Sequence, residues 1–467
     1  MNDFLILMKS ELAVTVIIFL LLFIKLSKGM NNEALLSLTQ VLLLANLLLG
    51  FFLNKQGSLF DGMFHTSSLI AFQKSILNLG VYLISLLCAD WLKKSQPMPE
   101  FFMLMLSALL GMFFMISSGN LLIFYLSLEL ATIPVAALAN FDLGKRISSE
   151  AAMKMILSSA FSSGILLFGI SLMYGATGTI SFAALSQSLD GSPLEILAFV
   201  LLFTGFAFKL SIVPFHLWTA DVYEGSPIAA TSFLSVVSKG SVAFIFISAL
   251  YNVFQPLHTV WYNLLVLLAV ATMLLGNLFA IRQQNIKRFL AFSSIAQVGF
   301  ILVGITGNSN ASVSSVVYFI LIYTFSNLAA FGVASVISSA TGKENIDDYK
   351  GLYKTNPFLT WILTLALFSL AGIPPTAGFF GKLFLISAGA GAANSSYWFI
   401  TIAALNMIIS LYYYLRVVRA MFMDTNDWPI EKTKTNRITK FALVICGAAI
   451  LLLGVLSWVY DYIVSLV

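Results

Sequence analysis

Charged residues are scarce in this chain. Only 10% of its 467 residues are Asp, Glu, Lys or Arg, whereas 59% are hydrophobic. An ordinary soluble domain has about 25% charged and about 45–50% apolar residues. This composition excludes a water-soluble fold, because too few polar side chains are present to cover its surface. No segment departs from the pattern, so a lipid bilayer is the expected medium for the entire chain.

Cysteine and histidine are also scarce, with two and three residues respectively. Cys88 and Cys446 lie far apart in hydrophobic segments, without a CxxC motif or a neighbouring histidine. This indicates neither a disulfide framework nor a metal or iron–sulfur site. The net charge is +5 and the pI is about 9.0, but the basic residues are scattered in short loops without an aromatic–basic patch. Nucleic acid is therefore not an expected partner.

Hydrophobic runs recur along the full length, and each helix that crosses a bilayer needs about 20 mostly apolar residues. The sequence predicts an all-α integral membrane protein with about fourteen transmembrane helices. The first run is interpreted as a retained helix, since no small-residue cleavage site follows it. The turn Ser117–Asn120 separates spans four and five and so fixes the direction of all later spans. The predicted spans are 4–26, 34–53, 67–91, 101–117, 120–139, 150–176, 194–220, 226–254, 259–281, 286–306, 312–338, 357–389, 398–422 and 440–464.

The distribution of Lys and Arg predicts the orientation. Of the 25 basic residues, 18 lie in or beside loops that follow odd-numbered spans. Basic residues accumulate on the cytoplasmic side of membrane proteins, so both termini are predicted to lie outside. The opposite side keeps only Lys9, Lys55 and Lys74.

Five charged residues remain inside predicted spans: Glu129, Lys154, Lys209, Lys239 and Lys382. A charge at the bilayer centre costs at least about 2.5–3.5 kcal/mol, and such residues usually face a wet interior and mark ion pathways. Burial disfavours the charged form of a lysine, and a nearby carboxylate favours it. A group whose charge follows its neighbours in this way suits a proton relay. We therefore expect a shared hydrophilic axis.

Other interpretations stay open for these residues. Lys154 lies four residues after Glu150, so its side chain could instead reach the cytoplasmic interface. The other lysines and Glu129 could form structural ion pairs only. His216, after Pro214 and Phe215, is either a relay member or a histidine satisfied by backbone carbonyls. The run 412–414 of three tyrosines is expected to serve packing and anchoring at the interface.

Two spans carry helix breakers beside a lysine. Span seven contains FAFKLSIVPFHLW, with Lys209 five residues before Pro214, and span twelve contains LAGIPPTAGFFGKLFLI, with Lys382 near its end. Proline removes a backbone hydrogen bond, so each break must lie where protein or water meets the freed carbonyls. Spans five apart cross the membrane in opposite directions. The placement predicts an inverted repeat, with an N-terminal segment 1–99, repeats 100–254 and 255–424, and a C-terminal helix in 425–467.

Four motifs resemble one family in the same order along the chain. These are LSLELATIP around Glu129, FKLSIVPFHLWTADVYEGSPIAATSFLSVVSKG at 208–240, RFLAFSSIAQVGF at 288–300 and LAGIPPTAGFFGKLFLI at 370–386. They resemble the antiporter-like membrane subunits of proton-pumping NADH:quinone oxidoreductase, respiratory complex I, over essentially the whole chain. The N-type subunits are favoured, because M-type members usually have a glutamate at the position of Lys382 and other types lack DVYEGSP in this form.

The resemblance implies that Glu129, Lys154, Lys209, Lys239 and Lys382 form a proton relay along the membrane centre, with His216 beside the broken helix. It implies a bacterial inner-membrane protein that moves protons, with other antiporter-like and small helical subunits as partners. NADH, FMN, iron–sulfur clusters and quinone are expected on those partner subunits, and neither a cofactor nor a metal on this chain. Two alternatives stay open: a subunit of an Mrp-type cation/proton antiporter, and a structural scaffold whose charges only hold helices together.

Overall fold

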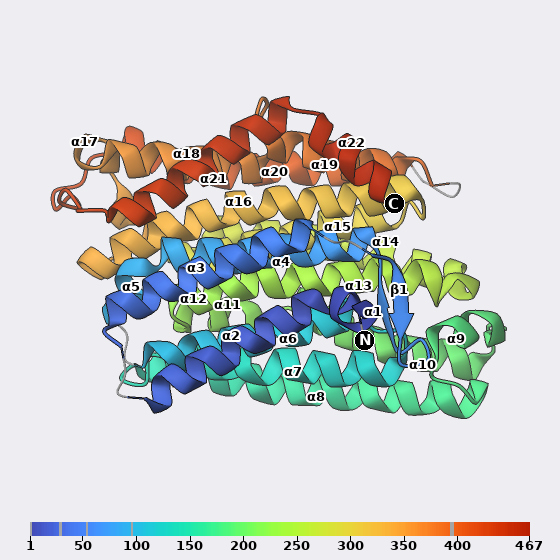
Figure 1. Ribbon diagram of the computed structural model, residues 1–467. Helices are drawn as coiled ribbons and strands as arrows, with labels where there is room; N and C mark the ends of the chain where they lie inside the picture. Colours follow the sequence, from blue (N-terminus) through green and yellow to red (C-terminus); the bar gives the residue numbers. More distant parts are fainter. Residues whose placement is uncertain (1, 28–29, 53–54, 95–96, 393–396) are drawn as a thin grey trace.

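A computed structural model describes residues 2–27, 30–52, 55–94, 97–392 and 397–467. Long helices dominate these residues and lie side by side in one bundle (Figure 1). The helices are α1 (Asn2–Leu7), α2 (Lys9–Leu26), α3 (Asn32–Phe51), α4 (Ser68–Leu87), α5 (Ala89–Lys94), α6 (Met98–Ile116), α7 (Leu121–Ala139), α8 (Arg146–Thr177), α9 (Phe182–Ser188), α10 (Pro193–Leu210), α11 (Leu217–Gly225), α12 (Ile228–Phe233), α13 (Lys239–Asn252), α14 (His258–Arg282), α15 (Ile286–Ile305), α16 (Asn310–Thr341), α17 (Leu352–Thr355), α18 (Pro357–Ala371), α19 (Ala377–Ala390), α20 (Tyr397–Phe422), α21 (Arg437–Val455) and α22 (Trp458–Leu466). A π-turn, η1 (Leu234–Ser238), joins α12 to α13, and η2 (Gln255–Leu257) and η3 (Ile346–Tyr349) are single 3₁₀ turns.

The all-α membrane fold class is confirmed. Among the described residues, twelve helices are long and apolar enough to cross a bilayer. The predicted spans 4–26 and 357–389 fall outside that set for two physical reasons. Helix α2 carries three charged residues, Lys9, Glu11 and Lys25, in its 18 residues, and the second segment is broken into α18 and α19. The turn that separates spans four and five is confirmed, because α6 ends at Ile116 and the side chain of Asn120 caps α7.

The bundle has two distinct ends. Helices α5 and α17 and the link between α20 and α21, which contain several of the basic residues, lie at the left of Figure 1. At the opposite end lie α9 and a small antiparallel hairpin that the sequence analysis did not predict, β1 (Gly57–Leu59) and β2 (Phe64–Thr66). Both termini lie toward the hairpin: α1 contacts β1, and Tyr462 of α22 packs on Phe72 at the start of α4.

Two groups of contacts recur with a constant spacing in the sequence. Gly111 of α6 lies against the backbone of Ala131 in α7, and 165 residues later Gly276 of α14 lies against the backbone of Ala296 in α15. In both pairs a Cβ on the glycine would lie under 3.0 Å from backbone atoms, so only glycine allows the approach. Asparagine caps α7 and α15 through Asn120 and Asn285, which are also 165 residues apart.

The long helices that follow these pairs also match. Helices α8 and α16 each contain 32 residues and end at a left-handed glycine, Gly178 and Gly342, with φ of 70° and 71°. After each helix the chain forms an antiparallel bridge back to the asparagine cap, between Asn120 and Ser181 and between Asn285 and Asn345. These shared contacts support the expectation that the chain contains two related halves.

Helices α10 and α18 end in the same way, at the breaks that the sequence predicts. The residue after each helix has a positive φ, 64° at Ser211 and 86° at Gly372. A proline-containing link then leads to the second half-helix, α11 or α19. Each break leaves carbonyl groups of its first half-helix without a partner in the next turn.

Lys74, which the sequence analysis counts with the charges of the outer side, is buried within the bundle. Lys74 lies within α4, and its Nζ is 2.5 Å from Oε1 of Glu11 in α2. The two side chains are only 3% and 2% exposed. Both residues stand near the ends of predicted spans, where a charge is normally solvated, so no sequence pattern indicates that they pair. The buried ion pair fixes α2 against α4 in the N-terminal three-helix segment.

Replacing Glu11 with Ala should leave the Lys74 ammonium buried without its partner. Breaking a buried pair costs about 3–5 kcal/mol, whereas replacing both members with apolar residues is often neutral. We expect Glu11→Ala to lower the melting temperature of the purified protein clearly, and the double variant Glu11→Leu, Lys74→Met to recover most of the loss. Asp3→Ala, which breaks the exposed pair with Lys55, is the matched control and should change little. Equal melting temperatures for the three variants would contradict this assignment.

Candidate functional site

Three of the predicted intramembrane lysines are buried in the bundle. Lys209, Lys239 and Lys382 are 9%, 4% and 0% exposed. Each stands at or just after an interruption of its helix: Lys209 is in the last turn of α10, Lys239 follows the π-turn η1, and Lys382 is in the first turns of α19. Interruptions of this kind are frequent at functional sites, because they free polar backbone groups for a buried charge.

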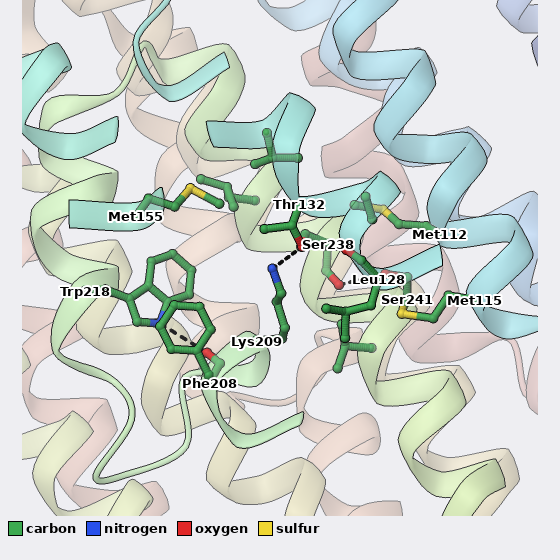
Figure 2. Close-up of a pocket in the computed structure, with 14 residues that line it drawn as sticks. Met112, Met115, Leu128, Thr132, Met155, Phe208, Lys209, Trp218, Ser238 and Ser241 are labelled. Carbon is green, nitrogen blue, oxygen red and sulfur yellow. Dashed lines mark hydrogen bonds between the residues drawn. The ribbon is translucent and has the colours of Figure 1, made fainter. Parts of the chain in front are cut away.

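Lys209 points into a small cavity lined mainly by α6, α7, α10 and α13 (Figure 2). Its Nζ donates to Oγ1 of Thr132, and to Oγ of Ser159 at 3.3 Å. The cavity measures about 10 Å³, which is about the space that one water molecule needs. Glu129 lies one helical turn before Thr132 and acts electrostatically on Lys209. Its Oε1 is buried and has no hydrogen-bond partner among the described residues.

Lys239 lies at the start of α13 and lines a cavity other than that of Lys209. Its Nζ donates to Oγ of Ser294 at 2.8 Å and lies 5.5 Å from the centre of the Tyr223 ring. Ser238 and Ser241, its near neighbours in sequence, line the cavity of Lys209 instead. The π-turn therefore presents polar groups to both sides, with Lys239 facing a second cavity.

Lys382 is held by the break that precedes it. Its Nζ donates to the carbonyl oxygens of Leu370 at 2.7 Å and Ala371 at 3.3 Å, and lies 4.7 Å from the centre of the Phe300 ring. These carbonyls end α18, where the helix dipole places partial negative charge. The broken helix thus supplies the polar partners that a lysine needs inside an apolar bundle.

His216 begins α11, directly after the break in span seven. Its side chain is 5% exposed, and its ring stacks on Phe279 at 6.4 Å. Neither ring nitrogen forms a hydrogen bond of normal geometry with any residue that the structure describes. Buried polar groups without a protein partner are rare and usually have water or a functional reason. The Pro214 carbonyl interacts with the ring, so both interpretations of this histidine stay open.

Lys154 is not brought together with the three buried lysines. Its side chain is 44% exposed and forms ion pairs with Glu150 at 2.8 Å and Asp221 at 2.7 Å. Asp221 also pairs with Arg288, which in turn contacts Glu224. The geometry matches the interpretation in which this lysine reaches toward the interface. The partner Asp221 comes from α11, and no sequence pattern predicts that α11 packs against α8.

A larger polar cavity opens near the end of the bundle that carries the basic loops. It measures about 450 Å³ and lies between α11, α15 and α16. Two ion pairs lie within the cavity wall. Nζ of Lys145 lies 3.1 Å from Oδ2 of Asp142, and Nζ of Lys287 lies 3.1 Å from Oε2 of Glu344, whose Oε1 accepts from Ser338. Polar residues in its wall include Lys145, Glu224, Ser226, Lys287, Ser338 and Glu344. We name it the polar vestibule.

Sequence reasoning missed the neutral partners of the lysines. Tyr413 and Tyr414 are fully buried, whereas Tyr412 is 63% exposed, so only Tyr412 agrees with an anchoring role at a surface. Tyr414 contacts Ser293 and Gln297 through its hydroxyl. Helix α15 carries Ser293, Ser294 and Gln297 and is almost entirely buried, which only the packing of the bundle reveals.

The chain matches a known family model and close relatives. The model described as NADH:quinone oxidoreductase/Mrp antiporter, TM, matches residues 118–410. A protein named NADH-quinone oxidoreductase subunit N from Phocaeicola vulgatus is 47% identical over 459 residues, which cover 97% of each chain. A protein of the same name from Moorella thermoacetica is 40% identical over 361 residues, 77% of this chain and 75% of the relative.

Solved structures share the fold. A chain of respiratory complex I from Thermus thermophilus with bound aureothin has a TM-score of 0.82 and 27% identity, and the match covers 97% of this chain and 98% of the other. A chain of the Mrp complex from Dietzia sp. has a TM-score of 0.80 at 20% identity, covering 98% and 95%. The second likeness concerns the fold alone.

Thiol labelling should distinguish the open vestibule from the closed cavity. The natural cysteines, Cys88 and Cys446, are both buried, so the native chain is a suitable background. Ser339 lines the vestibule, and Ser241, which is fully buried, lines the cavity of Lys209. We expect a membrane-impermeant thiol reagent to label Ser339→Cys from the side of the basic loops and to leave Ser241→Cys unlabelled. Equal labelling of both, or labelling of Ser339→Cys from the hairpin side only, would contradict the description.

Proposed function

Because the chain belongs to the NADH:quinone oxidoreductase/Mrp antiporter family of membrane proteins, we propose that it is the N-type membrane subunit of a NADH:quinone oxidoreductase and moves protons across the membrane. The relatives that carry this name span nearly the whole chain, and the similar chain of known structure comes from respiratory complex I. Redox chemistry takes place on partner subunits of the complex, which carry NADH, FMN, iron–sulfur clusters and quinone. Other antiporter-like and small helical subunits and the lipid bilayer surround this chain.

The observation that carries the proposal is the set of three buried lysines beside broken helices. Lys209, Lys239 and Lys382 each have hydroxyl or carbonyl partners rather than a carboxylate within hydrogen-bond distance. Such a site holds an ammonium group without fixing it permanently, because neutral partners bind a charge less tightly than a buried carboxylate does. A lysine with a purely structural role would be expected to form a buried ion pair with a carboxylate, as Lys74 does with Glu11.

The proposed proton route follows this geometry. Protons leave the cytoplasm through the polar vestibule, are held in the region of Lys209 and Lys239, pass towards Lys382 and leave to the outside. Glu129 adjusts the proton affinity of Lys209 through its charge, in addition to the effect of burial, and His216 stands beside the first break. Lys154 contributes at the margin of the route, through the ion-pair network with Asp221.

Energy for transport comes from the partner subunits. Moving one charge across 100 mV costs about 2.3 kcal/mol, whereas a change of one pKa unit corresponds to about 1.4 kcal/mol. One protonation change therefore cannot drive a proton against the membrane potential, so several coupled steps are needed.

We place the chain in a bacterial inner membrane with both termini outside. The contacts that recur every 165 residues support two inverted repeats, 100–254 and 255–424, between an N-terminal segment 1–99 and a C-terminal segment 425–467.

The rival function within the family is that of a subunit in an Mrp-type cation/proton antiporter. The likeness to the Mrp complex concerns the fold alone, whereas relatives at 40% identity or more carry the oxidoreductase name. NADH oxidation by the purified assembly, accompanied by proton uptake in a sodium-free medium, would exclude the rival.

Replacing Lys239 with Ala in the native assembly tests the pump. Proton uptake by inverted membrane vesicles during NADH oxidation is measured together with the abundance of the complex. We expect the uptake rate per complex to fall by about tenfold or more, because one barrier rises by at least about 1.4 kcal/mol when a proton-binding group is lost. Lys55→Ala, which changes an exposed lysine at the hairpin end, is the control. Normal uptake per complex in Lys239→Ala would favour the structural scaffold.

Arginine substitutions should separate Lys239 from Lys154. A guanidinium group stays protonated in proteins, and it forms ion pairs at least as well as an ammonium group. Lys154→Arg should therefore keep most of the proton uptake, since the exposed pairs with Glu150 and Asp221 need only a positive charge. Lys239→Arg should lose it, because that residue must release a proton. The same vesicle assay measures both, and equal activity of the two variants would contradict the difference in roles.

A further inference from the structure

A groove opens on the surface of the bundle between α3, α4 and α21. It measures about 430 Å³, and ligand sites in proteins typically measure about 300–1,000 Å³. Its wall is mostly apolar and carries one arginine; the members that matter here are Gln40, Val41, Leu44, Leu86, Arg437 and Phe441. None of these residues belongs to the lysine sites or to the polar vestibule. The groove is therefore a separate feature of the fold.

Two hydrogen bonds build the groove on the last turn of α4. The carbonyls of Ser85 and Leu86 lie at the end of this helix, where carbonyls have no partner within the helix. Gln40 of α3 donates to Ser85 at 3.0 Å, and Thr439 of α21 donates to Leu86 at 3.1 Å. Both donors are buried. These contacts fix α3 and α21 on α4, so the groove is preformed.

The groove has a cationic mouth and an apolar interior. Arg437 begins α21, directly after the link that lies at the end of the bundle with the basic loops (Figure 1). Val41 and Phe441, further along the walls, are 63% and 62% exposed. Leu44 lies twelve residues after Asn32, the start of α3, which is about 18 Å along the helix. Half of a bilayer with its interfaces measures about 20–22 Å, so the groove has the depth of one leaflet.

The positive charge at the mouth is not neutralised by the protein. Arg437 is exposed, and its guanidinium group forms no ion pair or hydrogen bond with any residue that the structure describes. The acidic residue in the first turn of α3, Glu33, is already paired with Lys93 at 2.8 Å. Residues 431–440 contain four basic residues and one acidic residue. The mouth therefore favours an anionic ligand.

The shape of the groove favours a lipid over a protein helix. A helix about 18 Å long and about 10 Å wide occupies about 1,400 Å³, roughly three times the volume of the groove. A single acyl chain is much narrower, and its burial against apolar walls is favourable. A small soluble anion would leave the apolar interior empty. The combination of a phosphate and an acyl chain matches both parts of the groove.

The headgroup follows from the charge. A guanidinium group binds a phosphate through two parallel hydrogen bonds, and basic pockets between transmembrane helices on the cytoplasmic side bind anionic headgroups. Choline or ethanolamine would bring a second positive charge beside Arg437, whereas glycerol would not. In the orientation proposed above, the mouth lies in the cytoplasmic leaflet.

We propose that this groove binds one anionic phospholipid of the phosphatidylglycerol type. Its phosphate lies on Arg437, and one acyl chain lies along Val41, Leu44 and Phe441. Helices α3 and α21 both pack on α4, and no hydrogen bond joins α3 to α21 among the described residues. The lipid therefore ties the N-terminal segment to the C-terminal helix. The proposal goes beyond proton transport and requires only that the chain crosses a bilayer.

Melting of the purified full-length protein in detergent, with phosphatidylglycerol added stepwise, tests the headgroup contact. A ligand that binds the folded state raises the melting temperature in a concentration-dependent way. We expect Arg437→Gln to weaken the affinity for phosphatidylglycerol by about fivefold, the effect of one basic residue at a membrane surface. Arg282→Gln is the matched control, because Arg282 is also exposed and ends α14. Equal affinities of the two variants, or equal effects of phosphatidylglycerol and phosphatidylcholine on the native protein, overturn the proposal.

Filling the groove tests the acyl chain. Val41→Trp places a large side chain on the groove wall, and Val16→Trp makes the same change on α2, at a position that is 56% exposed. Both positions face away from the core, so both variants should fold. We expect Val41→Trp alone to lose most of the rise in melting temperature that phosphatidylglycerol causes. An equal rise in the two variants contradicts the assignment of the acyl chain.

Electron cryomicroscopy of the intact complex in phosphatidylglycerol nanodiscs locates the occupant directly. We expect density for a lipid in the groove, with its phosphate within hydrogen-bond distance of the Arg437 guanidinium. A helix of a partner subunit in the groove, or a groove without lipid density, overturns the proposal.

Discussion

An ammonium group inside an apolar bundle needs polar partners, and the architecture of this chain depends on how those partners are supplied. The backbone of a regular helix has none to offer, because its polar groups bond within the helix. The breaks after α10 and α18 and the π-turn before α13 release carbonyls or re-aim side chains at the places where Lys209, Lys382 and Lys239 stand. An interruption without a polar partner would cost free energy in an apolar core, and so would a buried lysine without one. Where the two occur together, each supplies the polar partner that the other needs.

The two broken helices share the same kind of break but give their lysines different hydrogen-bond partners. Lys209 precedes its break and turns to hydroxyls on neighbouring helices, whereas Lys382 follows its break and returns to the carbonyls at the end of α18. The contacts that repeat at 165 residues concern backbone approach and capping, and not the charged side chains. A shared scaffold therefore carries two lysine sites with different partners.

Much of this was predictable from the sequence, for a physical reason. In a chain with so few charges, a lysine within a span is conspicuous, and so are the prolines and glycines beside Lys209 and Lys382. The partners were not predictable, because serine, threonine and glutamine are common between membrane helices and only packing selects Ser294 or Gln297. The same holds for Lys154, whose surroundings depend on Asp221 in a different helix. Glu11 and Lys74 were missed because charges near the ends of spans usually face solvent.

The π-turn Leu234–Ser238 sets the rotational phase of α13. An α-helix advances by about 100° per residue, and a π-turn accommodates one additional residue in its turn. Ser238 and Ser241 consequently face the cavity of Lys209, while Lys239 and Gly240 face the cavity of Ser294. Removing one residue from this turn would keep every side chain of α13 but rotate the helix by about 100°. The number of residues in this turn therefore determines which cavity Lys239 faces, as much as the identity of any residue does.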